Sequence, residues 1–324
     1  MRKEKQKRSR YSRRLRSIST TKRRRTRKQA GGEKKCLFIN WGPRIGLGNQ
    51  LCIYAATVIV KNKLKNWDIC IPPVENNPHT STDYRFLFKQ GRPVEMTPDI
   101  KGRVDTARVI HKDKDIRHGS WKNVDLIANS GDEFKNSTKN LRMKTTEEPE
   151  GGYYQHYGSI EPAIATIRPE IQEELTKNYG SDTLIKDPAS SAFIHIRYGD
   201  YKQVNLLSPI EYFKNGRARL EKESTIKTIY IISDKSGIEW ATKEGVTTPG
   251  EKSIHLIDDP DELKALYYMS QCKAGGCISA STYSIWGAIM GPEANDSSVI
   301  TYPSTWNKMV DGKDMGFPKR WIML

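Results

Sequence analysis

Several features that would assign the chain to a class of protein are missing from its 324 residues. The five cysteines are odd in number and form no C-x-x-C pair, so we expect reduced thiols rather than a disulfide framework. Cys272 and Cys277 are not accompanied by the further Cys or His ligands that a zinc site needs. No apolar run approaches the length of a membrane span, and the basic N-terminus has no apolar signal-peptide segment. We therefore expect a cytoplasmic protein without a transmembrane segment, in which the sequons at Asn136 and Asn295 are not used.

Acidic residues are nearly absent from positions 1–35, which hold 17 of the 54 lysines and arginines but only two of the 38 acids. This segment carries a formal charge of +15, and the rest of the chain is close to neutral at +1. Such a block cannot bury apolar surface, so residues 1–32 are predicted to form a disordered basic tail. Residues 1–35 are suited to a polyanion or to the anionic surface of a membrane, although a solvated tail without a specific partner is equally compatible.

The dinucleotide fingerprint G-x-G-x-x-G is absent, and a different glycine turn stands near the start of the chain. A strand is predicted over residues 36–41 and an amphipathic helix over 49–64, with the sequence GLGNQ at 46–50 between them. This arrangement suits an anion or a polar sugar, because backbone N–H groups and the helix dipole are available there. A tight turn without a ligand is the alternative.

Residues 68–150 give a weaker pattern, with short strands predicted at 69–71 and 107–110 and irregular structure between them. Asp113-Lys114-Asp115 has the D-x-D spacing of a metal-binding motif, but its charged surroundings favour a solvated loop. A helix is predicted over 159–179, where isoleucine and leucine recur at spacings of three and four.

The second half alternates strands with helices, which predicts a parallel α/β sheet with right-handed crossovers. Ser208 and Glu211 form a capping box for a helix that extends to about residue 223, and Asp259 to Glu262 precede another helix. Strands are predicted over residues 192–197, 228–233, 253–257, 276–280 and 299–302.

Arg197 follows an apolar strand, where the carboxyl ends of parallel strands meet ligands. The guanidinium is therefore placed to meet an anion, although a structural ion pair with Asp200 would leave the same pattern. Asp200 is expected to orient Arg197, while contact with a sugar hydroxyl and action as a base stay open. His195 either contacts a nucleotide or is a buried histidine satisfied by the backbone.

Ser281 and Thr282 begin a helix directly after a buried strand. Ordinary N-capping would explain these hydroxyls on their own. Together with Arg197, however, they give two anion-binding features at strand ends, and a pyrophosphate is the simplest ligand for both.

At these positions the chain resembles the α1,2-fucosyltransferases of glycosyltransferase family 11. The resemblance implies a GT-B-type α/β fold of two Rossmann-like domains facing across a cleft. It also implies inverting transfer of fucose from GDP-fucose to a galactose-containing glycan acceptor, with no metal and no cofactor. The motifs that carry it, in the family's order, are GLGNQ at 46–50, GYYQ at 152–155, HIR with GDY at 195–201, SD at 233–234 with IEW at 238–240, STYS with WGA at 281–288, and Pro303 with Trp306.

The resemblance divides the chain into the tail at 1–32, an acceptor-side α/β domain at 33–155, a linking helix at 156–185 and a GDP-sugar-binding α/β domain at 186–324. Tyr198 replaces the second arginine of the family's H-x-R-R-x-D, so we expect one cation fewer near the donor. The candidate catalytic residues are His195, Arg197 and Asp200; the donor-binding residues are His195, Arg197, Asp234, Ser281, Thr282 and Ser284; the residues on the sugar or acceptor side are Gly46, Gly48, Asn49 and Gln155.

Two alternatives remain open from the sequence. One is a transferase for another GDP-sugar or linkage, which the change at Tyr198 keeps open. The other is a catalytically inactive protein that binds a polyanion through its basic tail.

Overall fold

The computed structural model describes residues 35–39, 41, 45–74, 82–110, 137, 139–143, 154–259, 261–307 and 310–324. The basic tail, the D-x-D motif and the sequon at Asn136 lie outside these residues. The chain divides into two units, Met1–Lys35 and Cys36–Leu324. The fold described below is that of the second unit. Its first strand also includes Lys35, the last residue of the first unit.

The first half of this unit is built on a five-stranded sheet with the order β3-β2-β1-β5-β4. The pairs β1–β5, β4–β5 and β2–β3 are parallel. Helix α2 (Leu47–Lys63) follows β1, and α3 (Pro98–Asp105) precedes β4. Three-residue strands such as β3 and β5 carry too little periodicity to be predicted from sequence. The strands are β1 (Lys35–Ile39), β2 (Trp67–Ile71), β3 (Gly91–Pro93), β4 (Arg108–Ile110) and β5 (Leu141–Met143).

A disulfide joins Cys36 on β1 to Cys70 on β2, with the Cα atoms 5.6 Å apart. The expectation of reduced thiols is therefore wrong for these two cysteines. They face each other because β1 and β2 are neighbours in the sheet, and a separation of 34 residues gives no local sign of this. Cys52, Cys272 and Cys277 are buried free thiols.

The second half is built on a six-stranded parallel sheet with the order β13-β10-β9-β6-β7-β8. Its helices are α6 (Gly199–Gln203), α7 (Ile210–Glu221), α8 (Lys235–Lys243), α9 (Glu262–Gln271) and α10 (Thr282–Met290). A small antiparallel pair, β11 (Thr305–Asn307) and β12 (Val310–Asp311), stands apart from the sheet. The strands of the sheet are β6 (Ser191–His195), β7 (Thr228–Ile232), β8 (Ser253–Ile257), β9 (Gly275–Cys277), β10 (Val299–Tyr302) and β13 (Ile322–Met323).

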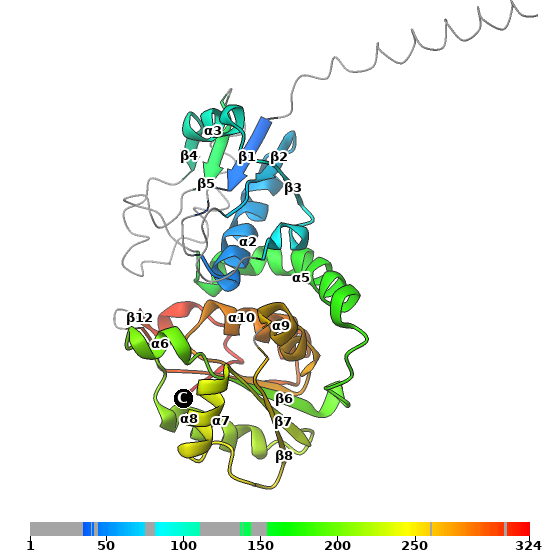
Figure 1. Cartoon of the computed structure of the whole chain (residues 1–324), viewed down its shortest axis with the longest axis vertical. Coiled ribbons are helices and arrows are strands. Elements are labelled where there is room, and N and C mark those ends of the chain that lie inside the picture. Colours follow the sequence, from blue (N-terminus) through cyan, green and yellow to red (C-terminus); the bar gives the residue numbers. More distant parts are fainter. Residues whose placement is uncertain are drawn as a thin grey trace, which may run out of the picture. The chain divides into compact units, whose positions relative to one another are not determined.

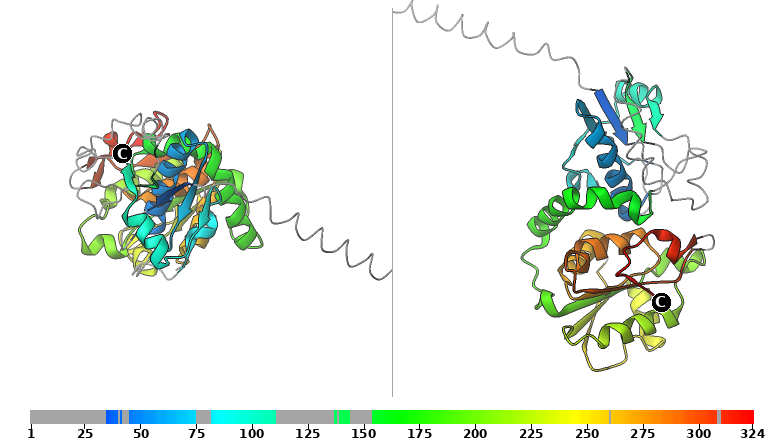
Figure 2. Two further views of the ribbon diagram at one scale, coloured as in Figure 1. Left: turned by 90° about the horizontal axis from the view of Figure 1, so that it is seen from above. Right: turned by 180° about the vertical axis from the view of Figure 1, so that it is seen from behind.

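Helix α5 (Tyr157–Tyr179) connects the two halves and packs against α2 and α9. In Figure 1 and in the rear view of Figure 2 it passes, in green, between the blue elements of the first sheet and the orange helices α9 and α10. Helix α2 also packs against α10, and one hydrophobic cluster includes residues of all four helices. Two parallel α/β sheets that share this core confirm the predicted fold class.

Two helix starts differ from the prediction. Helix α2 begins at Leu47 with Gly46 at its N-cap, so Gly48 lies in its first turn rather than in the loop before it. The capping box at Ser208 is wrong, because α7 has Pro209 at its N-cap and the buried Ser208 hydroxyl accepts from the Ala280 N–H at 3.4 Å. Capping ahead of α9 is confirmed, with the Asp261 side chain accepting from the Leu263 and Lys264 N–H groups.

Candidate functional site

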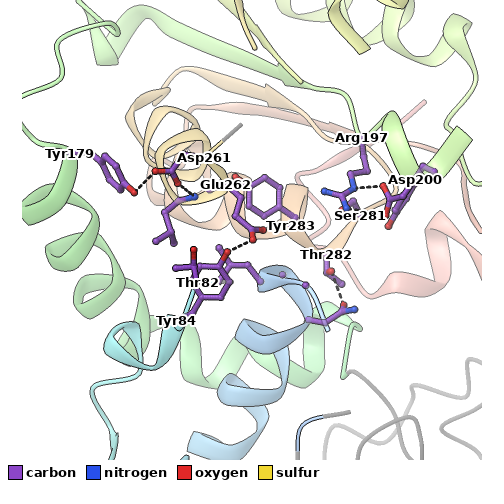
Figure 3. A pocket seen from close by; sticks show the side chains of 16 residues that line it. Thr82, Tyr84, Tyr179, Arg197, Asp200, Asp261, Glu262, Ser281, Thr282 and Tyr283 are labelled. Atoms are coloured by element: carbon purple, nitrogen blue, oxygen red, sulfur yellow. Dashed lines mark hydrogen bonds and ion pairs between the residues drawn. The ribbon is translucent and has the colours of Figure 1, made fainter. Parts of the chain in front are cut away.

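A cavity of about 570 Å³ opens between elements of the two halves, the arrangement of a GT-B-type fold. The start of α2 lines it from the first half, and the starts of α9 and α10 and the segment after β6 line it from the second (Figure 3). Parallel strands deliver these segments at their carboxyl ends, which explains why they converge. The lining residues are Gly46, Leu47, Gly48, Asn49, Thr82, Tyr84, Tyr179, Arg197, Asp200, Tyr201, Asp261, Glu262, Leu263, Ser281, Thr282 and Tyr283.

Arg197 lies two residues beyond the end of β6, and its backbone is fixed by Ser279, which follows the neighbouring strand β9. The Ser279 hydroxyl donates to the His195 carbonyl at 2.6 Å and accepts from the Arg197 N–H at 2.9 Å. The Ile196 N–H donates to the Ile232 carbonyl at 3.0 Å. The chain is thus held on both sides at the point where the arginine side chain turns into the cavity. Ser279 has no distinguishing sequence signal, and we did not predict its role.

The guanidinium of Arg197 is bound along one edge by Asp200, as predicted. Nη2 donates to Asp200 Oδ2 at 3.0 Å, and Nε lies 3.0 Å from Oδ1 as an ion pair without a hydrogen bond. Nη1 hydrogen-bonds to none of the described residues, and the Arg197 side chain is 36% exposed. Burial lowers the pKa of Arg197, but Asp200, with smaller contributions from Tyr201 and Glu262, outweighs this and raises it. The arginine is therefore a fixed cation with one edge available to a ligand.

Ser281 and Thr282 lie at the N-terminal end of α10, on the cavity wall. Ser281 is the N-cap residue, yet its side chain makes no capping hydrogen bond. Tyr201 also lines the cavity, and its ring lies 5.6 Å from the Arg197 guanidinium carbon. Ordinary capping therefore does not account for the Ser281 hydroxyl, and the positive end of the helix faces the cavity beside Arg197.

His195 and Ser284 lie behind the cavity wall rather than on it. His195 is 5% exposed and Ser284 is fully buried, and Nδ1 of the histidine is 2.5 Å from the Ser284 hydroxyl. Burial, with a smaller contribution from the charge of Arg197, lowers the pKa of His195 to about 3. The histidine is thus neutral, and its partner is a side chain rather than the backbone.

Gly48 and Asn49 bring the first half of the unit into contact with α10. A Cβ atom on Gly48 would lie 2.3 Å from the Tyr283 backbone nitrogen, so only glycine permits this approach. Oδ1 of Asn49 accepts from the Thr282 hydroxyl at 2.8 Å and from Nε2 of Gln155 at 3.0 Å. The structure thereby brings the predicted residues Gly46, Gly48, Asn49, Gln155, Ser281 and Thr282 together around one cavity.

Asp234 and Tyr198 are not part of the cavity lining. Asp234 caps α8 by accepting from the Gly237 N–H at 2.8 Å, and its other oxygen accepts from the Gly199 N–H at 3.0 Å. The Tyr198 ring packs 5.4 Å from that of Trp240 in an apolar cluster. The tyrosine ring itself therefore lies away from the cavity wall.

The side of the cavity opposite Arg197 was missed by the sequence analysis. Tyr84 donates a hydrogen bond to Oε1 of Glu262, and the Tyr283 hydroxyl donates to the Glu262 carbonyl. Tyr179, at the end of α5, donates to Asp261 Oδ2 at 2.8 Å. Tyr84 and Glu262 are 178 positions apart, so no local pattern could have paired them.

Within the described ranges, His, Cys, Asp and Glu side chains form no group of three that could hold a metal ion. None of the described helices combines the length and apolar composition that spanning a membrane requires.

Comparison with known proteins gives a family match and several distant likenesses. A sequence model described as glycosyl transferase family 11 matches residues 93–324. The O-antigen biosynthesis glycosyltransferase WbnK of Escherichia coli is 22% identical over 294 residues, covering 81% of this chain and 92% of that protein. The fucosyltransferase NodZ from Bradyrhizobium is 10% identical with a TM-score of 0.47, covering 80% of this chain and 93% of that one. The E. coli heptosyltransferase WaaC with ADP is 12% identical with a TM-score of 0.44, covering 89% of this chain and 92% of that one.

Proposed function

The chain belongs to glycosyl transferase family 11, and on that basis we propose that it moves fucose from GDP-fucose to a hydroxyl of a galactose-containing glycan, in α1,2 linkage and with inversion. A glycan acceptor also fits the name of the relative WbnK, an O-antigen biosynthesis glycosyltransferase. The proposal assigns the reaction to the cavity between the two halves of the unit.

The observation that carries the proposal is the pairing of Arg197 with the start of α10 on one wall. Transfer breaks a glycosidic bond while negative charge grows on the departing β-phosphate. One wall of the cavity is formed by Arg197, whose Nη1 has no partner among the described residues, and by the start of α10. The start of α10 contributes the Ser281 and Thr282 hydroxyls and the N-terminal dipole of the helix. Nη1 of Arg197 and the helix dipole would meet that charge as they stand, whereas the Thr282 hydroxyl would first have to leave Asn49. A metal or cofactor is not required by the scheme.

Asp200 then has a positioning role. Its two oxygens hold one edge of the guanidinium and leave the other edge toward the cavity. His195, neutral and behind the wall, would support Ser284 and the ring of Tyr283, whose centroid is 5.2 Å away. Neither residue needs to touch the donor for the scheme to work.

The first half of the unit is assigned to the sugar or the acceptor. Gly46, Gly48 and Asn49 line the cavity from the start of α2, and Gln155 is bound to Asn49. Oδ1 of Asn49 accepts from the Thr282 hydroxyl, so one hydrogen bond links a residue of the proposed acceptor side to a residue of the proposed donor side.

Calorimetric titration of the chain with GDP, GDP-fucose and GDP-mannose, with and without a chelator, tests this proposal. We expect GDP-fucose to bind more tightly than GDP-mannose and the chelator to have no effect. Tighter binding of GDP-mannose would show that the donor is a GDP-sugar other than GDP-fucose. No binding of any GDP-sugar would contradict it and favour the inactive, polyanion-binding alternative.

A further inference from the structure

Three carboxylates line the cavity, and two of them bind groups that belong to the local structure around them. Asp200 has one oxygen hydrogen-bonded to Arg197 and the other 3.0 Å from its Nε. Asp261 accepts from two N–H groups of α9 through Oδ1 and from Tyr179 through Oδ2. Both carboxylates therefore hold neighbouring groups in place.

The third carboxylate, Glu262, is placed differently. It is the first residue of α9, it lines the cavity, and its Oε1 accepts from the buried phenol of Tyr84. Its own carbonyl accepts from Tyr283, so its backbone is held by α10 while its side chain is held from the first half. A side chain fixed from two elements has the positional definition that a reacting group needs.

Figure 3 shows Glu262 with Tyr84 and Thr82 on one side of the cavity and Arg197 with Asp200 on the other. The charge of Glu262 is felt by Arg197, where it contributes to raising the pKa of the arginine. The two groups line the same cavity from different sides. A donor whose pyrophosphate lies against Arg197 would direct its sugar toward Glu262.

We propose that Glu262 is the general base that removes the proton from the attacking hydroxyl, with Tyr84 as its positioning residue. This inference rests on the proposed function. The acceptor oxygen forms its bond to the anomeric carbon, its proton passes to the Glu262 carboxylate, and the bond from the anomeric carbon to the β-phosphate oxygen breaks. The electron pair of that bond leaves on GDP, against Arg197. The step balances without any further reactant.

The test uses the full chain with GDP-fucose and compares water with azide anion as the nucleophile. Water must lose a proton as it attacks, whereas azide carries none. Attack by azide therefore needs no general base, but it still needs the groups that stabilise the departing GDP. We expect Glu262→Gln to lower GDP release in water by about 10²-fold to 10⁴-fold, the usual contribution of general base catalysis. Azide should restore GDP release in this variant and give fucosyl azide of inverted configuration, and it should not restore Arg197→Ala.

Glu173→Gln is the matched control, because it makes the same change of charge at an exposed position of α5 outside the cavity lining. Calorimetric binding of GDP shows whether Glu262→Gln keeps its donor site. A variant that hydrolyses GDP-fucose like the parent chain overturns the inference, as does one that binds GDP normally but is not restored by azide. A parent chain that neither binds nor turns over GDP-fucose overturns the proposed function, and the inference falls with it.

Discussion

Thr282 donates a hydrogen bond of 2.8 Å to the side-chain oxygen of Asn49, although 233 positions separate the two residues. The same oxygen accepts from Gln155. One amide therefore joins the start of α2, the segment before α5 and the start of α10 at the edge of the cavity. The proposed donor side and acceptor side are thus coupled through a single side chain.

Asn49→Ala removes the acceptor from both donors, and we expect it to lower the free energy of unfolding by about 1–3 kcal/mol, the range for partners left unsatisfied. Asn49→Asp keeps Oδ1 and should recover most of that loss, while Gln155→Ala removes one of the two bonds and should lose less. Denaturant unfolding of the three variants measures the differences. Equal stability of Asn49→Ala and the parent chain would show that the amide does not join the halves.

Gly48→Ala tests the close approach of α2 and α10. Because the new Cβ would lie 2.3 Å from the Tyr283 nitrogen and 2.7 Å from the Thr282 carbonyl carbon, backbone must move. Overpacking of this kind costs about 1–3 kcal/mol, and we expect turnover to fall together with stability.

Gly102→Ala provides the control for this substitution, since it also lies in a helix but nothing lies within 4 Å of its Cβ position. It should be neutral or stabilising by up to about 1 kcal/mol, from helix propensity alone. If Gly48→Ala behaves like Gly102→Ala, the helices do not meet as described.

The strand that leads to Arg197 and the helix start at Ser281 could be predicted from sequence because each is a local change, from an apolar run to polar side chains. The opposite side of the cavity could not, since Tyr84 and Glu262 meet only through tertiary structure. His195 shows a different limit. Alternation along a strand would place it on the same face as Arg197, but β6 ends at His195, and only the arginine lines the cavity. The disulfide between Cys36 and Cys70 likewise depends on the order of strands in the sheet.

His195 should make stability depend on pH. Its pKa is lowered from 6.5 to about 3 in the folded chain, so between these values the unfolded chain binds one more proton than the folded chain. The contribution of His195 to the free energy of unfolding is fully present above about pH 6.5. It decreases as the pH falls toward about 3, by about 1.4 kcal/mol per pH unit at most. His195→Asn should have a shallower slope of unfolding free energy against pH across this window. An identical slope would contradict a neutral, buried histidine, and His255→Asn, at an exposed position of β8, is the control.

The Cys36–Cys70 disulfide should contribute about 2–4 kcal/mol to stability by restricting the unfolded chain. We expect Cys36→Ala and Cys70→Ala to lower the midpoint of denaturant unfolding by the same amount, and a reductant to lower that of the parent chain but not of the variants. Thiol counting of the unfolded, non-reduced protein provides an independent measurement. Five reactive thiols, rather than three, would contradict the bond.

The central claim is that Arg197 meets the charge that develops on the departing GDP, and the rate of GDP release by Arg197→Ala tests it most directly. Removing a fixed donor of this kind costs about 10² to 10³ in rate, or roughly 3–4 kcal/mol. We therefore expect a loss of this size in kcat for Arg197→Ala, with partial recovery in Arg197→Lys and an unchanged unfolding midpoint in both. A folded Arg197→Ala chain that turns over GDP-fucose at the parent rate would contradict the account.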